Sequence, residues 1–310
     1  MNHFLIVSLS RSGGKLMRML LDGHPELNAF PFEHWNRSSK GTFPARKVAE
    51  FAAMSSDDRL ATAGAPLVEK KLRKLHPDPV VSNVMSHWRA DSERATTLPA
   101  MYESLARRYF CALGEDPGRA PVNHCGSVCR LSRDELDAVF GKGIHVLTVR
   151  DPRAVFASME ALRHHKYTVK GIRKRHVAVP EVERHISKME VVDGASTYLR
   201  EFCDDYRQMT ARYALHPDVV CLRFEDLVTS TETAMRQFCD RVQLPWNASL
   251  LEPTALGQGR APNSSYARQG SGVHANAAGD WVNRIDSEIR RHIEDALAPE
   301  MSALGYARVA

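Results

Sequence analysis

Residues Phe4 to Leu27 read FLIVSLSRSGGKLMRMLLDGHPEL. An apolar run at Phe4–Leu9 is followed by a Ser/Arg/Gly/Lys cluster, and apolar residues then return at helical spacing over Gly14–Asp22. This order predicts a buried strand, a tight basic loop and a helix. Glycines at positions 13 and 14 allow the loop to turn and to point backbone N–H groups at an anion, and the helix N-terminus adds partial positive charge. The stretch predicts a phosphate-binding loop; a strand-to-helix turn that merely needs glycine is the alternative.

The loop departs from the pattern of a nucleotide triphosphatase. That pattern, G-x-x-x-x-G-K-[ST], requires glycine six positions before Lys15 and a hydroxyl directly after it. The chain has Leu9 and Leu16 at these positions. Because the hydroxyl that would hold Mg²⁺ is missing, we expect a phosphate-containing donor that reacts without a metal.

Strands and helices alternate along the rest of the chain. Further strands are expected at Asn28–Phe32, His145–Val149 and Val219–Phe224, and helices at 44–62, 99–113, Asp134–Phe140, 152–163, Ser196–Leu215, Thr231–Val242 and Asp286–Leu304. The stretch between 62 and 99, with three prolines, is expected to be looser. The alternation predicts an α/β fold with a central parallel sheet flanked by helices. Ligands of such sheets bind beyond the carboxyl ends of the strands, where Arg11, Glu33 and Arg150 are expected.

Composition narrows the class of protein. The 310 residues are 43% hydrophobic and 25% charged, which is typical of a globular protein, and no linker-like stretch divides them, so we expect one domain over residues 1–310. The formal net charge of +5 suits an anionic ligand. The six cysteines form no CxxC pair, which favours reduced thiols over a disulfide framework. No apolar run is long enough to span a membrane and no signal peptide is evident, so we expect a cytoplasmic protein.

Three motifs, in order, resemble sulfotransferases that use PAPS (3′-phosphoadenosine 5′-phosphosulfate). RSGGKLMRMLLDGHPEL resembles the 5′-phosphosulfate loop of the tyrosylprotein and carbohydrate branch. VRDPRAVFASM (Val149–Met159) is similar to the family's 3′-phosphate motif, and VVCLRFEDLV (Val219–Val228) to its strand ending in (R)YEDL. The matches run from residue 5 to 306, where LGY is also family-like. The resemblance implies a soluble, bacterial-type enzyme with a P-loop NTPase-like three-layer fold, PAPS as donor, PAP as product and no metal.

The resemblance also implies the donor-binding residues. They are Arg11, Ser12, Gly13, Gly14, Lys15 and Leu16 at the 5′ end, Arg150 and Ser158 at the 3′-phosphate, Phe224 against the adenine, and Ser265. PAPS has two anionic ends and therefore needs two cationic sites. Arg150 offers a planar fork for phosphate oxygens. The alternative for Arg150 is an ion pair with Asp151 at the start of a helix.

Sulfuryl transfer needs a cation at the leaving phosphate and a base for the acceptor hydroxyl. Arg11 occupies the family's loop position for the cation, and Lys15 stands where the family often has threonine, so either can serve. Glu33 is the favoured base by its spacing in the tyrosylprotein branch, and His34 is its rival. Glu33 can instead be a surface carboxylate paired with Arg37.

A departure from the family lies in APVNHCGS (Ala120–Ser127), where a lysine is usual and none is present. His124 is the candidate replacement, as a donor to the transferring group or as another base. The alternative is a structural histidine. The missing lysine keeps open a non-catalytic PAP(S)-binding homologue, and a P-loop kinase-like phosphotransferase is the other competitor.

The acceptor is expected to contact two insertions, roughly 36–100 and 163–195. The stretch Arg163–His176 carries six basic and no acidic residues. It predicts an anionic acceptor, with a solvated basic face as the alternative. No aromatic-interleaved pattern indicates nucleic acid. The sequence therefore predicts transfer to a hydroxyl or amine of a carbohydrate, lipid or other small acceptor.

Overall fold

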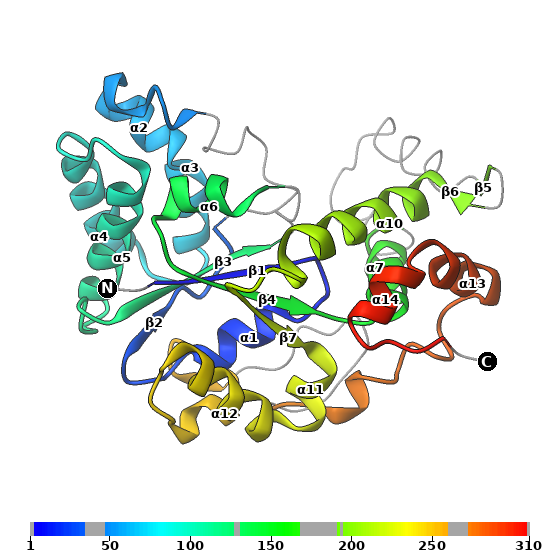
Figure 1. Ribbon diagram of the computed structural model, residues 1–310. Helices are drawn as coiled ribbons and strands as arrows, with labels where there is room; N and C mark the ends of the chain where they lie inside the picture. The colour runs from blue at the N-terminus through cyan, green and yellow to red at the C-terminus, as the bar shows by residue number, and fades with distance from the viewer. Residues whose placement is uncertain are drawn as a thin grey trace.

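One parallel sheet forms the centre of the protein. The computed structural model describes residues 3–34, 47–126, 131–167, 191–192, 195–259 and 272–308. Five strands pair in the order β2-β3-β1-β4-β7 (Figure 1). They are β1 (Phe4–Ser8), β2 (Leu27–Ala29), β3 (Ala120–Gly126), β4 (Ile144–Val149) and β7 (Val219–Arg223). The predicted α/β class and parallel sheet are confirmed.

Strand β1 shows why the fold has three layers. All five of its residues are buried, and successive side chains face opposite sides of the sheet. Phe4 and Ile6 join a core cluster with α1 (Gly14–Leu21) and α12 (Thr231–Val242). Leu5 and Val7 join the opposite cluster, with α5 (Leu98–Ala112), α6 (Arg133–Phe140) and α10 (Thr197–Met209). The sheet is therefore covered by helices on both faces.

The register of the sheet brings distant loops together. Ser8, the last residue of β1, pairs with Gly126 of β3 on one side and with Thr148 of β4 on the other. The loops that leave β1, β3 and β4 therefore begin at the same edge. The strand order reverses at β1, and such a switch point is where open α/β sheets bind ligands.

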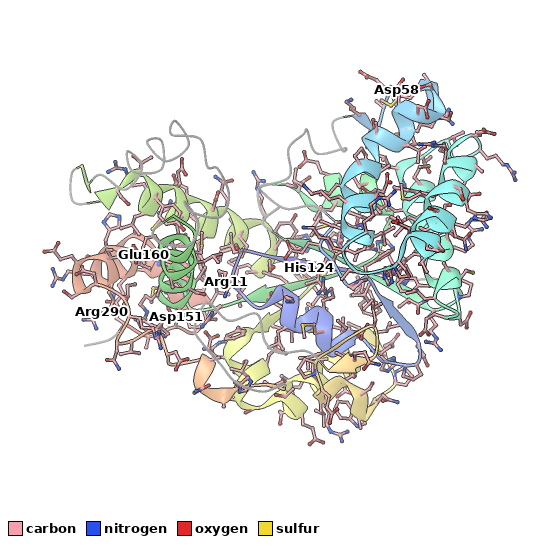
Figure 2. The ribbon with its side chains drawn as sticks, turned by 180° about the vertical axis from the view of Figure 1, so that it is seen from behind. Arg11, Asp58, His124, Asp151, Glu160 and Arg290 are labelled. Atoms are coloured by element: carbon pink, nitrogen blue, oxygen red, sulfur yellow. The ribbon has the colours of Figure 1, made fainter. Side chains whose placement is uncertain are left out.

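Four helices lie on the side of the molecule away from the C-terminal helices α13 (Ser287–Ala296) and α14 (Ala298–Ala303) (Figures 1 and 2). They are α2 (Ser56–Thr62), α3 (Ala65–Leu72), α4 (Asp78–Ser92) and α5. The prediction of a looser stretch here was wrong. Of the predicted helix at 44–62, residues 44–46 lie outside the described residues, and the rest contains two short helical segments, Phe51–Ala53 and α2, in place of one helix. Pro66 and Pro79 lie in the first turns of α3 and α4, where a missing N–H costs no helical hydrogen bond. The prolines start helices instead of preventing them.

Other predicted elements differ in their bounds, and two of the differences have a clear physical reason. The second strand ends at Ala29, although Phe30 N–H still donates to the carbonyl of Val122. The expected C-terminal helix is two helices, α13 (Ser287–Ala296) and α14 (Ala298–Ala303). Pro299 lies in the first turn of α14, and its ring is incompatible with a continuous helix.

The other elements complete the chain. They are η2 (Phe51–Ala53), α7 (Pro152–Tyr167), β5 (Val191–Val192), β6 (Ala195–Ser196), η3 (Thr210–Ala214), α11 (Phe224–Thr229), η4 (Ala248–Leu251), β8 (Thr254–Ala255), β9 (Gln258–Gly259) and η5 (Ala275–Ala277). The predicted capping box of α6, with Ser132 and Glu135, is present. None of the helices in the described ranges has both the length and the apolar character that a membrane span requires. That the chain is one domain stays a prediction.

Candidate active site

A cavity of about 180 Å³ lies at the carboxyl ends of β1, β3 and β4. It is lined by most of the residues that the sequence predicted: Arg11, Gly13, Gly14, Lys15, Leu16, Glu33, His124, Arg150, Ser158 and Phe224. Figure 2 shows Arg11 and His124 in the central part of the molecule, near α1. Residues from five separate stretches of the chain therefore share one site.

The loop between β1 and α1 has the geometry of an anion site. Gly13 adopts a left-handed conformation with φ of 101°, which side chains rarely tolerate. At Gly14 a Cβ atom would lie 2.6 Å from His124 Nε2 and would also collide with Ser8 Oγ. Glycine is needed at both positions. The first N–H groups of α1 have no partner within the helix and open at the cavity.

Arg11 links the two phosphate motifs. It is not glycine, yet its φ is 73°, so its backbone is held in a strained conformation. Its carbonyl oxygen accepts a hydrogen bond from Arg150 Nη1 at 3.2 Å. Its own Nε donates to Ser158 Oγ at 3.0 Å. The Arg11 side chain therefore points toward the second motif.

Arg150 is 6% exposed and is fixed from several directions. Its Nη2 donates to the carbonyl of Ala277 at 2.8 Å, and its guanidinium lies 4.3 Å from the ring centre of Phe224. The alternative pairing with Asp151 is wrong, because that carboxylate accepts from Arg153 at 2.7 Å instead. Arg150 is thus presented at the cavity by main-chain and aromatic contacts.

The turn after β4 is held by a hydrogen bond to the Val219–Val228 motif. Glu225, the glutamate of FEDL, accepts hydrogen bonds from the Asp151 N–H and from the Tyr306 hydroxyl. Burial raises the pKa of the Glu225 carboxyl. The Tyr206 hydroxyl donates to the carbonyl of Arg150 at 2.9 Å. These contacts explain why the VRDP and FEDL motifs occur together: one positions the other.

On another wall, a carboxylate, an imidazole and a hydroxyl stand in a row. Glu33 Oε1 lies 3.9 Å from His124 Nδ1, and His124 Nε2 lies 3.4 Å from Ser8 Oγ. The Glu33 side chain is 35% exposed, whereas the His124 side chain is 2% exposed. Gly126 leaves room for the carboxylate, since a Cβ there would lie 2.8 Å from Glu33 Oε2. Glu33 is therefore the member of the row that solvent reaches.

Positive charge surrounds this row. Burial, followed by the charges of Arg18 and other cations including Lys15, holds the pKa of His124 well below its usual range. Burial lowers the pKa of Arg18 to about 10, so it stays protonated at neutral pH. His124 is consequently a neutral imidazole that can accept or donate one hydrogen bond at each nitrogen according to its tautomer.

The structure does not bring His34 to the cavity. Its ring is 2% exposed and packs edge-on against Phe30, with centroids 4.5 Å apart, and near Phe32 and Tyr102. Burial lowers its pKa to about 3. A ring in this aromatic cluster is not placed to receive a proton from a molecule in the cavity, which removes the rival to Glu33.

Two buried polar atoms, Ser12 Oγ and His274 Nε2, have no hydrogen-bond partner within the described residues. His274 lines the cavity, and because burying such a group unpaired costs free energy, it fits a polar ligand at this site. Ser12, which the sequence predicted as a donor-binding residue, is fully buried and is not among the residues that line the cavity. Ser265 and the basic stretch 168–176 lie outside the described residues, as do the side chains of 163–167.

Three residues near the site escaped the sequence analysis. Ser8 carried a usable signal, since a hydroxyl at a strand end next to a phosphate loop can reach the ligand. Lys71 and His274 carried none, because no motif contains them and only the tertiary fold brings them close.

A family model described as "Sulfotransferase family" matches residues 4–248. The chain belongs to the sulfotransferase family. The match covers β1 through α12 and so includes all three motifs that line the cavity. No curated protein sequence matches the chain.

Solved structures of other sulfotransferases are similar to this one. The sulfotransferase domain from the Synechococcus PCC 7002 olefin synthase superposes with a TM-score of 0.62 at 18% identity, covering 98% of this chain and 94% of that domain. The sulfotransferase domain from the curacin biosynthetic pathway gives a TM-score of 0.49 at 16% identity over 99% of each chain. The first likeness shows that this sulfotransferase has the three-layer, P-loop-like fold that the sequence predicted.

Proposed function

We propose that this sulfotransferase takes a sulfuryl group from PAPS and transfers it to a hydroxyl, or an amine, of a carbohydrate, lipid or other small acceptor. The observation that carries the proposal is the presence of two cationic groups along one cavity. Lys15 and the N-terminus of α1 form the first, and Arg150 with Arg11 and Ser158 forms the second. A donor with a 5′-phosphosulfate and a 3′-phosphate requires such a pair.

Arg11 and Lys15 interact with different groups, so we assign them to different phosphates of the donor. Arg11 donates to Ser158 and belongs with Arg150, whereas the charge of Lys15 acts on His124. We therefore assign the 3′-phosphate to Arg11, Arg150 and Ser158, and the leaving 5′-phosphate to Lys15 and the α1 amides. His274 lines the cavity, and its Nε2, which has no partner among the described residues, fits a further polar contact to the donor. PAPS, when bound, supplies the activated sulfuryl group.

The acceptor step uses the part of the cavity wall that carries Glu33 and His124. Glu33 takes the proton from the acceptor as the new bond forms between the acceptor oxygen or nitrogen and sulfur. The bond between sulfur and the bridging oxygen breaks, and PAP leaves with the electron pair. His124 is neutral and lies beside Gly14, so the tautomer protonated at Nε2 would donate a hydrogen bond to the transferring group.

The test is transfer of radioactive sulfur from labelled PAPS to a panel of alcohols, sugars, phenols and amines, neutral and anionic, in EDTA. Labelled product with release of PAP supports the proposal. PAP binding without product from any acceptor would favour a non-catalytic binder, and binding of ATP only with Mg²⁺ would favour a kinase-like enzyme. The anionic acceptor and the cytoplasmic location stay predictions.

A further inference from the structure

One lysine of α3 faces inward. Lys70, Arg73 and Lys74 are exposed, whereas Lys71 is only partly so. Its Nζ donates a hydrogen bond to the main-chain carbonyl of Glu33 and lies 3.5 Å from that of His34. It also stands 5.7 Å from the ring centre of Phe32. The end of the Lys71 side chain therefore meets three consecutive residues, the middle one of which lines the cavity.

Glu33 needs such support because it lies outside regular structure. β2 ends at Ala29, four residues earlier. Near Glu33, the backbone is tied to the sheet by the His34 N–H, which donates to the carbonyl of His124 at 2.9 Å. The hydrogen bond from Lys71 to the Glu33 carbonyl holds the same short segment to α3. The two bonds together fix the direction in which the Glu33 side chain leaves the main chain.

Lys71 also contributes charge to the row of Glu33 and His124. Burial lowers the pKa of Lys71 more than any neighbouring group does, and the titratable groups that act on it are Glu33, Cys125, Arg18 and Lys74. The groups that act on His124 are the cations Arg18, Lys71 and Lys15 and the His34 ring. A cation beside Glu33 and His124 favours an ionised carboxylate and a neutral imidazole, the forms that accept a proton.

We propose that Lys71 is a positioning residue for sulfuryl transfer: it holds the Glu33 carbonyl so that the carboxylate faces the acceptor, and it does not touch the donor. This inference rests on the proposed function. It gives α3 a role in the active site, through the hydrogen bond from Lys71 to the Glu33 carbonyl.

The first arm of the test needs no acceptor. Lys71→Met keeps the length of the side chain but removes its charge and its donor, and Lys70→Met on the same helix is the matched control. Hydrogen exchange of the unliganded protein should be about tenfold or more faster at the His34 amide in Lys71→Met, and unchanged in β1. Lys70→Met should match the wild type throughout. Equal protection of His34 in all three proteins would overturn the positioning role.

The second arm uses PAPS with whichever acceptor of the panel turns over. Lys71→Met should lower kcat about tenfold to hundredfold with PAP affinity unchanged, and Lys71→Arg should restore part of the loss. In a Glu33→Gln background, Lys71→Met should change kcat by less than about twofold, because the group it positions no longer acts. An equal loss of kcat in both backgrounds, or a parallel loss of PAP affinity, would show that Lys71 does not act through Glu33.

The two arms separate the two claims. Should the wild type give no labelled product, the proposed function would fail while the exchange experiment would still decide whether Lys71 holds the Glu33 backbone. Should the wild type turn over and Lys71→Met retain its full kcat, the proposed function would stand and the role of Lys71 would be refuted.

Discussion

The two walls of the cavity are built in different ways. The side that we propose for the donor comprises Arg11, Lys15, Arg150, Ser158 and Phe224, which lie in, or just after, the turns that follow β1, β4 and β7. The side that we propose for the acceptor comprises Glu33, from a segment beyond β2, and His124, from within β3, with Lys71 of α3 behind them on the Glu33 carbonyl. The donor side is a product of short local motifs, whereas the acceptor side exists only through tertiary contacts. Function on the acceptor side should therefore be easier to change without affecting donor binding.

The strongest test of this division is Glu33→Gln. The amide keeps the shape of the carboxylate but cannot take a proton, so kcat should fall by about 10²–10⁴. Because Glu33 lies on the acceptor side, the dissociation constant for PAP should stay the same. Turnover is measured with labelled PAPS and PAP affinity by calorimetry. Near-normal turnover would transfer the role of base to His124.

The reciprocal test is Arg150→Ala. A charged hydrogen bond to the 3′-phosphate contributes about 1.5–3 kcal/mol, so PAP affinity should fall by roughly ten- to a hundredfold. Calorimetric titration with PAP gives the value. Arg236→Ala on the exposed surface of α12 is the control and should bind PAP normally. Unchanged PAP affinity in Arg150→Ala would show that Arg150 does not bind the 3′-phosphate.

A smaller effect is expected at His274, which tests whether the donor side extends beyond the motifs. Its Nε2 is buried with no partner among the described residues, so a bond to the donor should contribute about 0.5–1.5 kcal/mol. His274→Ala should therefore weaken PAP binding by about twofold to tenfold. His87→Ala, at an exposed position of α4, is the control. An affinity equal to that of the wild type would confine the donor site to the three motifs.

The smallest effect concerns the helices behind the acceptor side. Asp91 of α4 accepts two hydrogen bonds at 2.8 Å from Arg108 of α5, and this pairing lowers the pKa of Asp91 to about 2. A lowered pKa means that the stabilisation is present at neutral pH and is lost as the pH falls from about 4 toward 2. Asp91→Asn should lower the free energy of unfolding by about 1 kcal/mol at neutral pH and by progressively less on acidification.

Denaturant unfolding at several pH values measures this difference, with Glu103→Gln on α5 as the control. PAP affinity at neutral pH should be the same in the wild type and Asp91→Asn. If the loss in free energy of unfolding persists at low pH, the ion pair is not its source. A loss of PAP affinity in Asp91→Asn would show that donor binding depends on these helices.

The same division explains how much the sequence could predict. Three motifs could be recognised from the sequence: the loop at residues 11–16, VRDP and FEDL. Each combines a strand end, a turn and a helix start within about ten residues. Glycine at position 13 and proline at position 152 are required by the local backbone, so they signal structure without any knowledge of the fold.

The acceptor side was harder for a physical reason. Glu33 and His34 are neighbours, and the sequence could not tell which one faces the cavity; the aromatic cluster of Phe30, Phe32 and Tyr102 decides it by enclosing His34. Lys71 lies in a stretch predicted to be loose because its prolines were taken as breakers. Its contact with Glu33 joins residues 38 positions apart, which no local pattern encodes.

The most direct test of the central claim is a calorimetric titration with PAP, run beside ADP and ATP, first in EDTA and then with Mg²⁺. A cavity that reads both a 5′ and a 3′ anionic group should bind PAP in EDTA at least about tenfold more tightly than ADP, which lacks the 3′-phosphate. Mg²⁺ should change that affinity little. Equal binding of PAP and ADP, or tight binding of ATP only when Mg²⁺ is present, would contradict the assignment of the cavity to PAPS.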